Sequence, residues 1–340
     1  MAATAEKILI VAPSWIGDMV MAQPLLMRLL QQNPHTQIDV LAPEWVAPLL
    51  ARMPQVGKVI SNPFGHGALQ LGARHALGKQ LRKKNYAATY VLPNSFKSAL
   101  IPFFAGIPQR IGFKGEARYG LINVMHQLDE KKLPLMVERF AMLAQAPNDN
   151  LRRPVERPAL NVTDAMRSAT LKKLQLNPDK PVIAFCPGGE YGPAKRWPTQ
   201  HFGELAERLV AQHYQIWILG SAKESPLGAE IQAASGGICV DLTGKTNLGE
   251  VIDLISAADK VVSNDSGLMH LAAALDKPTA ALFGSTSPGF TPPLSNKAKV
   301  ISLHLECSPC FKRECPLGHF KCMNDLLPEI VMPALDKSAI

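Results

Sequence analysis

Strand-like and helix-like patterns of apolar residues alternate along the first half of the chain. Short segments rich in apolar residues, which are typical of buried strands, occupy positions 7–12, 37–41, 58–60 and 87–92. Between them, apolar residues recur at helical spacing from Ala22 to Leu30 and over 45–51, 68–84 and 96–105. This alternation predicts a parallel sheet that is covered by helices on both faces.

The same alternation begins again after a proline-rich break in the middle of the chain. Residues 146–181 are polar, carry prolines at 147, 154, 158 and 178, and contain one helical stretch near 163–174, so we expect the domain linker there. Strands are predicted at 182–186, 215–219, 260–264 and 279–283, and helices at 200–212, 227–234, 248–257 and 267–275. The fold class is therefore α/β, with two doubly wound, Rossmann-like domains at residues 1–165 and 178–325. A last helical stretch in residues 326–340 could pack on either domain.

The composition is that of a globular protein without a membrane span. Of 340 residues, 47% are hydrophobic and 19% are charged, which is enough apolar sequence for the cores of two domains. The longest apolar run, 99–107, is interrupted by Pro102 and is far shorter than the ~20 residues that a spanning helix needs. The apolar stretch 8–12 lies between charged residues and Pro13, unlike the apolar core of a signal peptide. We expect a cytoplasmic protein.

Positive charge is concentrated in the first half of the chain. Residues 1–170 carry 20 Lys and Arg against 11 Asp and Glu, whereas residues 171–340 carry 16 against 17. Such an asymmetry favours an anionic partner, either a macromolecule or a membrane surface. Only 6% of the residues are aromatic and no nucleic-acid-binding motif is present, so we expect no nucleic acid and favour a phosphorylated lipid surface.

Loops that follow the predicted strands of the second half carry residues suited to a phosphorylated ligand. In open parallel sheets, ligands bind beyond the carboxyl ends of the strands. After Cys186, Gly188 and Gly189 allow backbone amides to approach an anion, while Lys195 and Arg196 add positive charge. For any one loop, a glycine turn that merely closes a tight connection explains the sequence as well.

Three further loops of the second half point to the same ligand. Asp265, Ser266 and Gly267 open a helix whose N-terminus is suited to bind an anion, and residues 284–287 form a small polar loop. Glu224 is placed to accept hydrogen bonds from ribose hydroxyls, although a solvated surface role fits it equally. Convergence of four such loops predicts a nucleotide-type site in the second domain.

Asp18, in the loop that leaves the first strand, is the conspicuous carboxylate of the first domain. An N-cap of the following helix is one role for it. Pro24 suggests that the regular helix begins several residues later and leaves the carboxylate available as a general base.

The six cysteines fall into two groups. Cys186 and Cys239 fit small core residues, whereas Cys307, Cys310, Cys315 and Cys322 are clustered in sequence. In a cytoplasmic protein this spacing suggests structural zinc rather than disulfides, with His319 as a substitute ligand, but reduced packing thiols are the favoured alternative.

Four segments together resemble the ADP-heptose:lipopolysaccharide heptosyltransferase family, of the heptosyltransferase II type. They are the runs APSWIGDMVM at 12–21, CPGGEYGPAKRWP at 186–198, NDSGLMHLAAA at 264–274 and GSTSPGFTPPLS at 284–295. The similarity extends over nearly the whole chain. It implies a GT-B fold whose two domains face one another across a cleft, with ADP-heptose on the second domain and the acceptor on the first.

The resemblance also implies roles for single residues. It makes Asp18 the general base, and it places Lys195 on the donor diphosphate. Gly188, Gly189, Asp265, Ser266, Gly267 and His270 surround the diphosphate and sugar, and Glu224 by position contacts the ribose. No metal is then required for the reaction.

The implied reaction is an inverting transfer of heptose onto the first heptose of heptosyl-Kdo-lipid A. It belongs to lipopolysaccharide inner-core synthesis, at the cytoplasmic face of a Gram-negative inner membrane. Two alternatives stay open from the residues alone: a sister glycosyltransferase that acts at another core position, and a non-catalytic nucleotide-sugar-binding protein.

Overall fold

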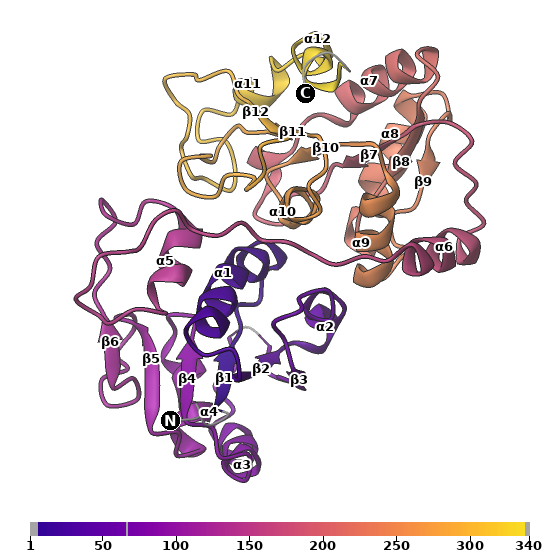
Figure 1. Ribbon diagram of the computed structural model, residues 1–340. Coiled ribbons are helices and arrows are strands. Elements are labelled where there is room, and N and C mark those ends of the chain that lie inside the picture. Colours follow the sequence, from indigo (N-terminus) through magenta and orange to yellow (C-terminus); the bar gives the residue numbers. More distant parts are fainter. Residues whose placement is uncertain (1–5, 66, 337–340) are drawn as a thin grey trace. The chain divides into compact units, whose positions relative to one another are not determined.

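The chain folds into two compact units. The computed structural model describes residues 6–65 and 67–336. One unit comprises Met1–Glu156 and the other Arg157–Ile340. Each contains one parallel sheet of six strands with helices on its faces (Figure 1). The predicted α/β class, with two doubly wound domains, is confirmed.

The sheet of the first unit has the strand order β3-β2-β1-β4-β5-β6. The chain builds outward from β1 to one side and then crosses to the other, so the switch point lies between β1 and β4. Figure 1 shows α1 and α5 on one side of this sheet and α3 and α4 on the other. The strands are β1 (Lys7–Val11), β2 (Gln37–Ala42), β3 (Lys58–Ser61), β4 (Ala88–Val91), β5 (Gln109–Phe113) and β6 (Val124–His126). The helices are α1 (Ile16–Gln32), α2 (Ala47–Leu50), α3 (Leu71–Arg82), α4 (Phe96–Phe104) and α5 (Met136–Met142).

The second unit repeats this topology with the order β12-β11-β10-β7-β8-β9. Its switch point lies between β7 and β10. Helix α7 packs against α8 and α12, and α6 packs against α9. The strands are β7 (Val182–Cys186), β8 (Gln215–Ile218), β9 (Val240–Asp241), β10 (Lys260–Asn264), β11 (Thr279–Leu282) and β12 (Ala298–Ile301). The helices are α6 (Asp164–Lys173), α7 (Thr199–Ala211), α8 (Ser225–Ala234), α9 (Leu248–Ala257), α10 (Gly267–Ala274), α11 (Lys321–Asn324) and α12 (Pro328–Val331).

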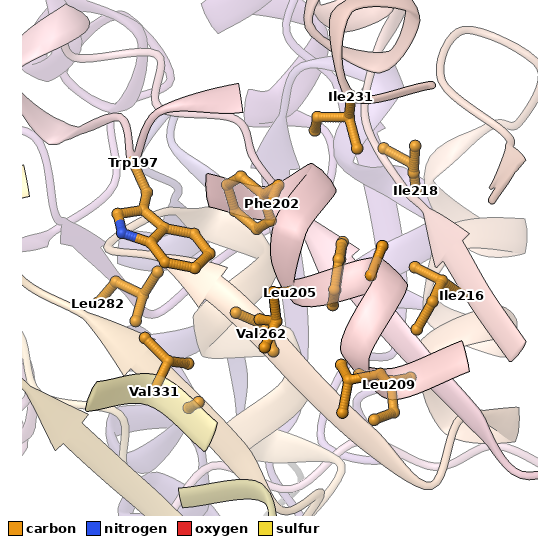
Figure 2. Packing of buried hydrophobic residues seen from close by; sticks show 14 of the residues in the cluster. Trp197, Phe202, Leu205, Leu209, Ile216, Ile218, Ile231, Val262, Leu282 and Val331 are labelled. Atoms are coloured by element: carbon orange, nitrogen blue, oxygen red, sulfur yellow. The ribbon is translucent and has the colours of Figure 1, made fainter. Parts of the chain in front are cut away.

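The core of the second unit lies between the sheet and α7. Figure 2 shows Phe202, Leu205 and Leu209 of α7, at helical spacing, packed with side chains from the sheet. Trp197, which precedes the helix, is 1% exposed, and its indole N–H donates to the Leu326 carbonyl (2.6 Å). The loop before α7, which carries the candidate ligand residues, therefore ends on a rigid anchor.

The boundary between the units lies before the predicted position 165. Arg28 of α1 is buried, and it donates from Nε to Glu156 Oε2 (2.7 Å) and from Nη2 to the Arg152 carbonyl (2.8 Å). The next residues bond to the second unit, where the Leu160 N–H donates to the Ala274 carbonyl (3.0 Å). Prolines mark the break in the pattern, but they do not show on which unit each piece of the linker packs.

The predicted late start of the first helix is wrong. Helix α1 begins at Ile16 and contains Pro24 in its interior, with Trp15 at the N-cap position. Asp18 is therefore neither the N-cap nor ahead of the helix, but lies in its first turn. Burial of the apolar face of α1, which includes Leu25, outweighs the backbone hydrogen bond that the proline cannot make.

The C-terminal segment packs on the second unit within the described residues. It is broken into α11, α12 and a 3-10 turn (Met332–Leu335), rather than forming one helix. Leu326, Val331 and Leu335 belong to the same core cluster as α7. No helix within residues 6–65 and 67–336 combines the length and the hydropathy needed to cross a bilayer.

Candidate functional site

The loops singled out in the second unit follow four strands that are neighbours in the sheet. Strands β11, β10, β7 and β8 are consecutive and parallel. The loops that leave their carboxyl ends therefore share one edge of the sheet, on both sides of the switch point. This is where open α/β sheets bind ligands.

Lys195, Asp265 and Thr286 meet on one carboxylate oxygen. Lys195 Nζ lies 2.6 Å from Asp265 Oδ2, and the Thr286 hydroxyl donates to the same oxygen (2.6 Å). The Asp265 side chain is 4% exposed and that of Lys195 is 16% exposed. These three residues thus join the loops after β7, β10 and β11, and Asp265 holds the ammonium group at the edge of the sheet.

Asn264, the last residue of β10, fixes both ends of the loop that carries Lys195. Its buried side-chain amide donates to the Pro187 carbonyl (2.7 Å), and its Oδ1 accepts from the Trp197 N–H (3.2 Å). The loop is therefore held in place from the neighbouring strand.

Gly188 and Glu224 are in direct contact. A Cβ added at Gly188 would lie 2.1 Å from Glu224 Oε1, so any other residue there would displace the Glu224 carboxylate. The other carboxylate oxygen, Oε2, accepts from the Ser221 N–H (2.6 Å) in a capping box. Glu224 thus lies beside the glycine loop as predicted, but part of its hydrogen-bonding capacity is used to cap its own turn.

The remaining donor candidates surround the start of α10. Ser266 is the N-cap residue, although its side chain makes no cap hydrogen bond, and Gly267 is the first helical residue. Gly189 lies on the β7 loop, where an added Cβ would approach Arg196 Cγ to 3.3 Å. The structure therefore brings Gly188, Gly189, Lys195, Glu224, Asp265, Ser266 and Gly267 to the same edge.

His270 lies one turn into α10 and is buried. Burial lowers the pKa of its imidazole to about 4, an effect that Lys195 reinforces and Asp265 opposes. The ring is therefore neutral near pH 7. The neutral imidazole can donate or accept a hydrogen bond with a ligand, but it brings no charge to the site.

The four clustered cysteines line one small cavity beside these loops. Cys307, Cys310, Cys315 and Cys322 surround about 20 Å³, together with His319 and Ala194. The Phe320 N–H donates to Cys315 Sγ (3.4 Å) and lowers the pKa of that thiol. Within the described part of the chain, however, no three His, Cys, Asp or Glu side chains are placed to hold a metal ion, so zinc stays a prediction.

The two other cysteines lie where core residues were predicted. Cys186 and Cys239 are both buried. Burial raises the pKa of both thiols, so they remain protonated at neutral pH.

Asp18 lies at the corresponding edge of the first unit. It is half-buried in the first turn of α1, the helix that follows β1 at that unit's switch point. The sequence therefore located one candidate carboxylate in the first unit and a cluster of ligand residues in the second.

Sequence reasoning missed two residues that shape the second-unit site. Thr286 was seen only as part of a polar loop, and Asn264 only as the first residue of a motif. Both act through contacts between loops distant in sequence, namely Thr286 to Asp265 and Asn264 to Pro187. The available signal was their position, because Asn264 ends β10 and Thr286 lies in the loop that follows β11.

Comparison with known proteins identifies a matching family, two similar enzymes and one similar solved structure. Residues 74–321 match the model of "Glycosyltransferase family 9 (heptosyltransferase)". The chain is 47% identical over 339 residues to lipopolysaccharide heptosyltransferase 2 of Escherichia coli K12, with 97% of each chain covered. It is 48% identical to the enzyme of the same name from Salmonella typhimurium, again with 97% of each covered. The solved structure of the E. coli ADP-heptose lipopolysaccharide heptosyltransferase II superposes with a TM-score of 0.89 at 45% identity, over 97% of each chain.

Proposed function

Because the chain belongs to glycosyltransferase family 9, the heptosyltransferases, we propose that it transfers heptose from ADP-heptose to the lipopolysaccharide inner core. The observation that carries the proposal is the cluster of Lys195, Asp265 and Thr286 at the switch point of the second unit. A cation, glycine amides and the start of α10 occupy the edge where a nucleotide diphosphate binds in such sheets.

The donor diphosphate is held in this proposal by the protein's own charges. Lys195 offers its ammonium to the phosphate oxygens, and the backbone at Gly188 and Gly189 can approach them closely. As the sugar leaves, negative charge grows on the ADP, and these groups stabilise it by an electrostatic effect of several kcal/mol. The reaction therefore requires no divalent cation.

Asp18 is the proposed general base. An acceptor hydroxyl attacks the anomeric carbon from the face opposite to ADP, its proton passes to the Asp18 carboxylate, and the bond from carbon to the diphosphate oxygen breaks. This step inverts the anomeric configuration. A positioned base of this kind contributes on the order of 10²–10⁴-fold to the rate.

The acceptor is the first heptose of heptosyl-Kdo-lipid A, and the excess positive charge of the first half supports this assignment. Phosphate and carboxylate groups of such an acceptor, and the anionic surface of the membrane that carries it, would be attracted to the 20 basic residues of positions 1–170. The protein would then act peripherally at the cytoplasmic face of the inner membrane. Acceptor or liposome binding should weaken as salt rises, and salt-independent binding would contradict this part of the proposal.

The function is tested by incubating the purified chain with ADP-heptose and heptosyl-Kdo-lipid A and measuring the product mass. One added heptose is the expected result. Kdo-lipid A without heptose and a more extended core serve as acceptor controls. Transfer only to one of these controls would indicate a sister transferase, whereas ADP-heptose binding without transfer to any acceptor would indicate a non-catalytic binding protein.

A further inference from the structure

A second cation, Arg313, lies against the same aromatic ring as Lys195. The guanidinium Cζ of Arg313 lies 5.4 Å from the centroid of the Tyr191 ring, and Lys195 Nζ lies 5.3 Å from the same centroid. Both cations are therefore within cation–π distance of one tyrosine. Tyr191 belongs to the loop after β7 that also carries Gly188 and Gly189. Arg313 comes from the cysteine-rich segment, which runs from position 307 to position 322.

The backbone around Arg313 is fastened to the loop that carries Lys195. The Ala194 N–H donates to the Arg313 carbonyl (3.0 Å), and the Tyr191 hydroxyl donates to the Phe311 carbonyl (2.8 Å). A Cβ at Gly192 would lie 2.4 Å from the Arg313 carbonyl oxygen, so this glycine permits the close approach of the two segments. The position of Arg313 relative to Lys195 is thus set by direct contacts.

The same segment is also fastened to the loop after β11. The Phe311 N–H donates to the Ser285 carbonyl (2.7 Å), and the Ser308 hydroxyl donates to the Gly284 carbonyl. Thr286, the next residue of that loop, bonds to Asp265. Arg313 is therefore held from both sides by loops of the candidate donor site.

The two cations differ in how their charge is balanced. Lys195 is paired with Asp265, whereas Arg313 makes no ion pair with any carboxylate in residues 6–65 and 67–336, and its side chain is exposed. Two positive groups on one ring repel each other, and an anion placed near both would relieve that repulsion. A guanidinium has the planar, two-pronged donor geometry that matches a phosphate group.

From these contacts we infer that Arg313 is a second ligand of the donor diphosphate, acting together with Lys195 beside the Tyr191 ring. This inference rests on the proposed function, since the anion it names is the diphosphate of ADP-heptose. It assigns the cysteine-rich segment a direct part in donor binding, in addition to its packing. The sequence motifs of the donor loops did not include this segment.

The test compares Arg313→Gln with Lys312→Gln in the full chain. Both variants remove one exposed positive charge from the same segment. Of the two side chains, that of Arg313 is the one that contacts the Tyr191 ring. The affinities for ADP and for adenosine are measured by calorimetry, with the melting temperature as a check on folding. Arg313→Gln should weaken ADP binding by about tenfold or more and leave adenosine binding unchanged, as expected for a lost charged hydrogen bond. Lys312→Gln should bind ADP like the unmodified chain, and Arg313→Lys should recover part of the affinity.

Three results would overturn the inference. Equal ADP affinity of Arg313→Gln and Lys312→Gln would show that the guanidinium does not contact the diphosphate. An equal loss for ADP and adenosine would indicate that Arg313 only supports the loop, and a raised KM for the acceptor alone would place it at another site. In each case normal ADP binding and heptose transfer by the unmodified chain would leave the proposed function intact, whereas their absence would remove both proposals.

Discussion

Lys195 has two roles that mutation can separate: it neutralises the buried Asp265, and in the proposed function it binds the diphosphate. Lys195→Ala removes both at once. The Asp265 side chain is 4% exposed. Of the two side-chain donors described above, Lys195 and Thr286, only the Thr286 hydroxyl would remain in contact with its carboxylate. Removing one partner of a buried ion pair costs about 3–5 kcal/mol, and the remaining hydroxyl favours the lower end. We therefore expect Lys195→Ala to lower the free energy of unfolding by about 3 kcal/mol.

The double variant Lys195→Ala/Asp265→Asn removes the uncompensated charge. An amide in place of the carboxylate can still accept the Thr286 hydrogen bond, so most of the lost stability should return. Binding of ADP should not return, because a charged hydrogen bond worth about 1.5–3 kcal/mol is still missing. That energy corresponds to roughly 10- to 100-fold weaker binding. The single variant Asp265→Asn should bind ADP at least as tightly as the unmodified chain, since Lys195 no longer has a competing carboxylate.

Urea unfolding and ADP calorimetry on these three variants measure the two roles independently. If the double variant is no more stable than Lys195→Ala, the unpaired carboxylate is not the source of the instability. If Lys195→Ala binds ADP normally while remaining folded, Lys195 does not hold the diphosphate, and the assignment of the donor site fails.

Three further predictions concern the base, the histidines and metal dependence. Asp18→Asn should abolish heptose transfer while ADP affinity measured by calorimetry stays unchanged; near-normal turnover would remove Asp18 as the base. Burial lowers the pKa of His126 and of His270 to about 4, so both bind protons more weakly than in the unfolded chain. Unfolding free energy should therefore fall by about 1 kcal/mol per histidine between pH 7 and 5.5, and His126→Leu should flatten that dependence in urea titrations; an unchanged slope would contradict it. EDTA should leave transfer intact, and a loss that Mg²⁺ restores would show a metal requirement.

The alternation of apolar runs was sufficient to predict most of the fold. Strands such as β7 and β10 consist of consecutive buried residues, and they lie where the sequence placed them. Strands β5, β6, β9 and β12 were not predicted. Strand β9 has two residues and β12 is only half-buried, so neither produces a continuous apolar run.

The site was less predictable because its contacts join distant segments. Motifs identified Lys195 and Asp265 separately, but their spacing of 70 residues gives no sign that they form an ion pair. Asp18 was placed correctly after the first strand, yet its setting was misjudged because Pro24 was taken to delay the helix. Packing of α1 decided that question, and local sequence rules do not include packing.

The amide of Asn264 has a consequence for how the donor loop can vary. Because this single side chain joins the carbonyl of Pro187 to the N–H of Trp197, the loop behaves as a closed ring fastened at its base. The middle of the ring is fastened as well, by the Ala194 N–H to the Arg313 carbonyl and by Lys195 to Asp265, so a residue inserted or deleted there would disturb these contacts. A change in the length of this loop would therefore displace Lys195 from the donor site while leaving the sheet beneath it intact.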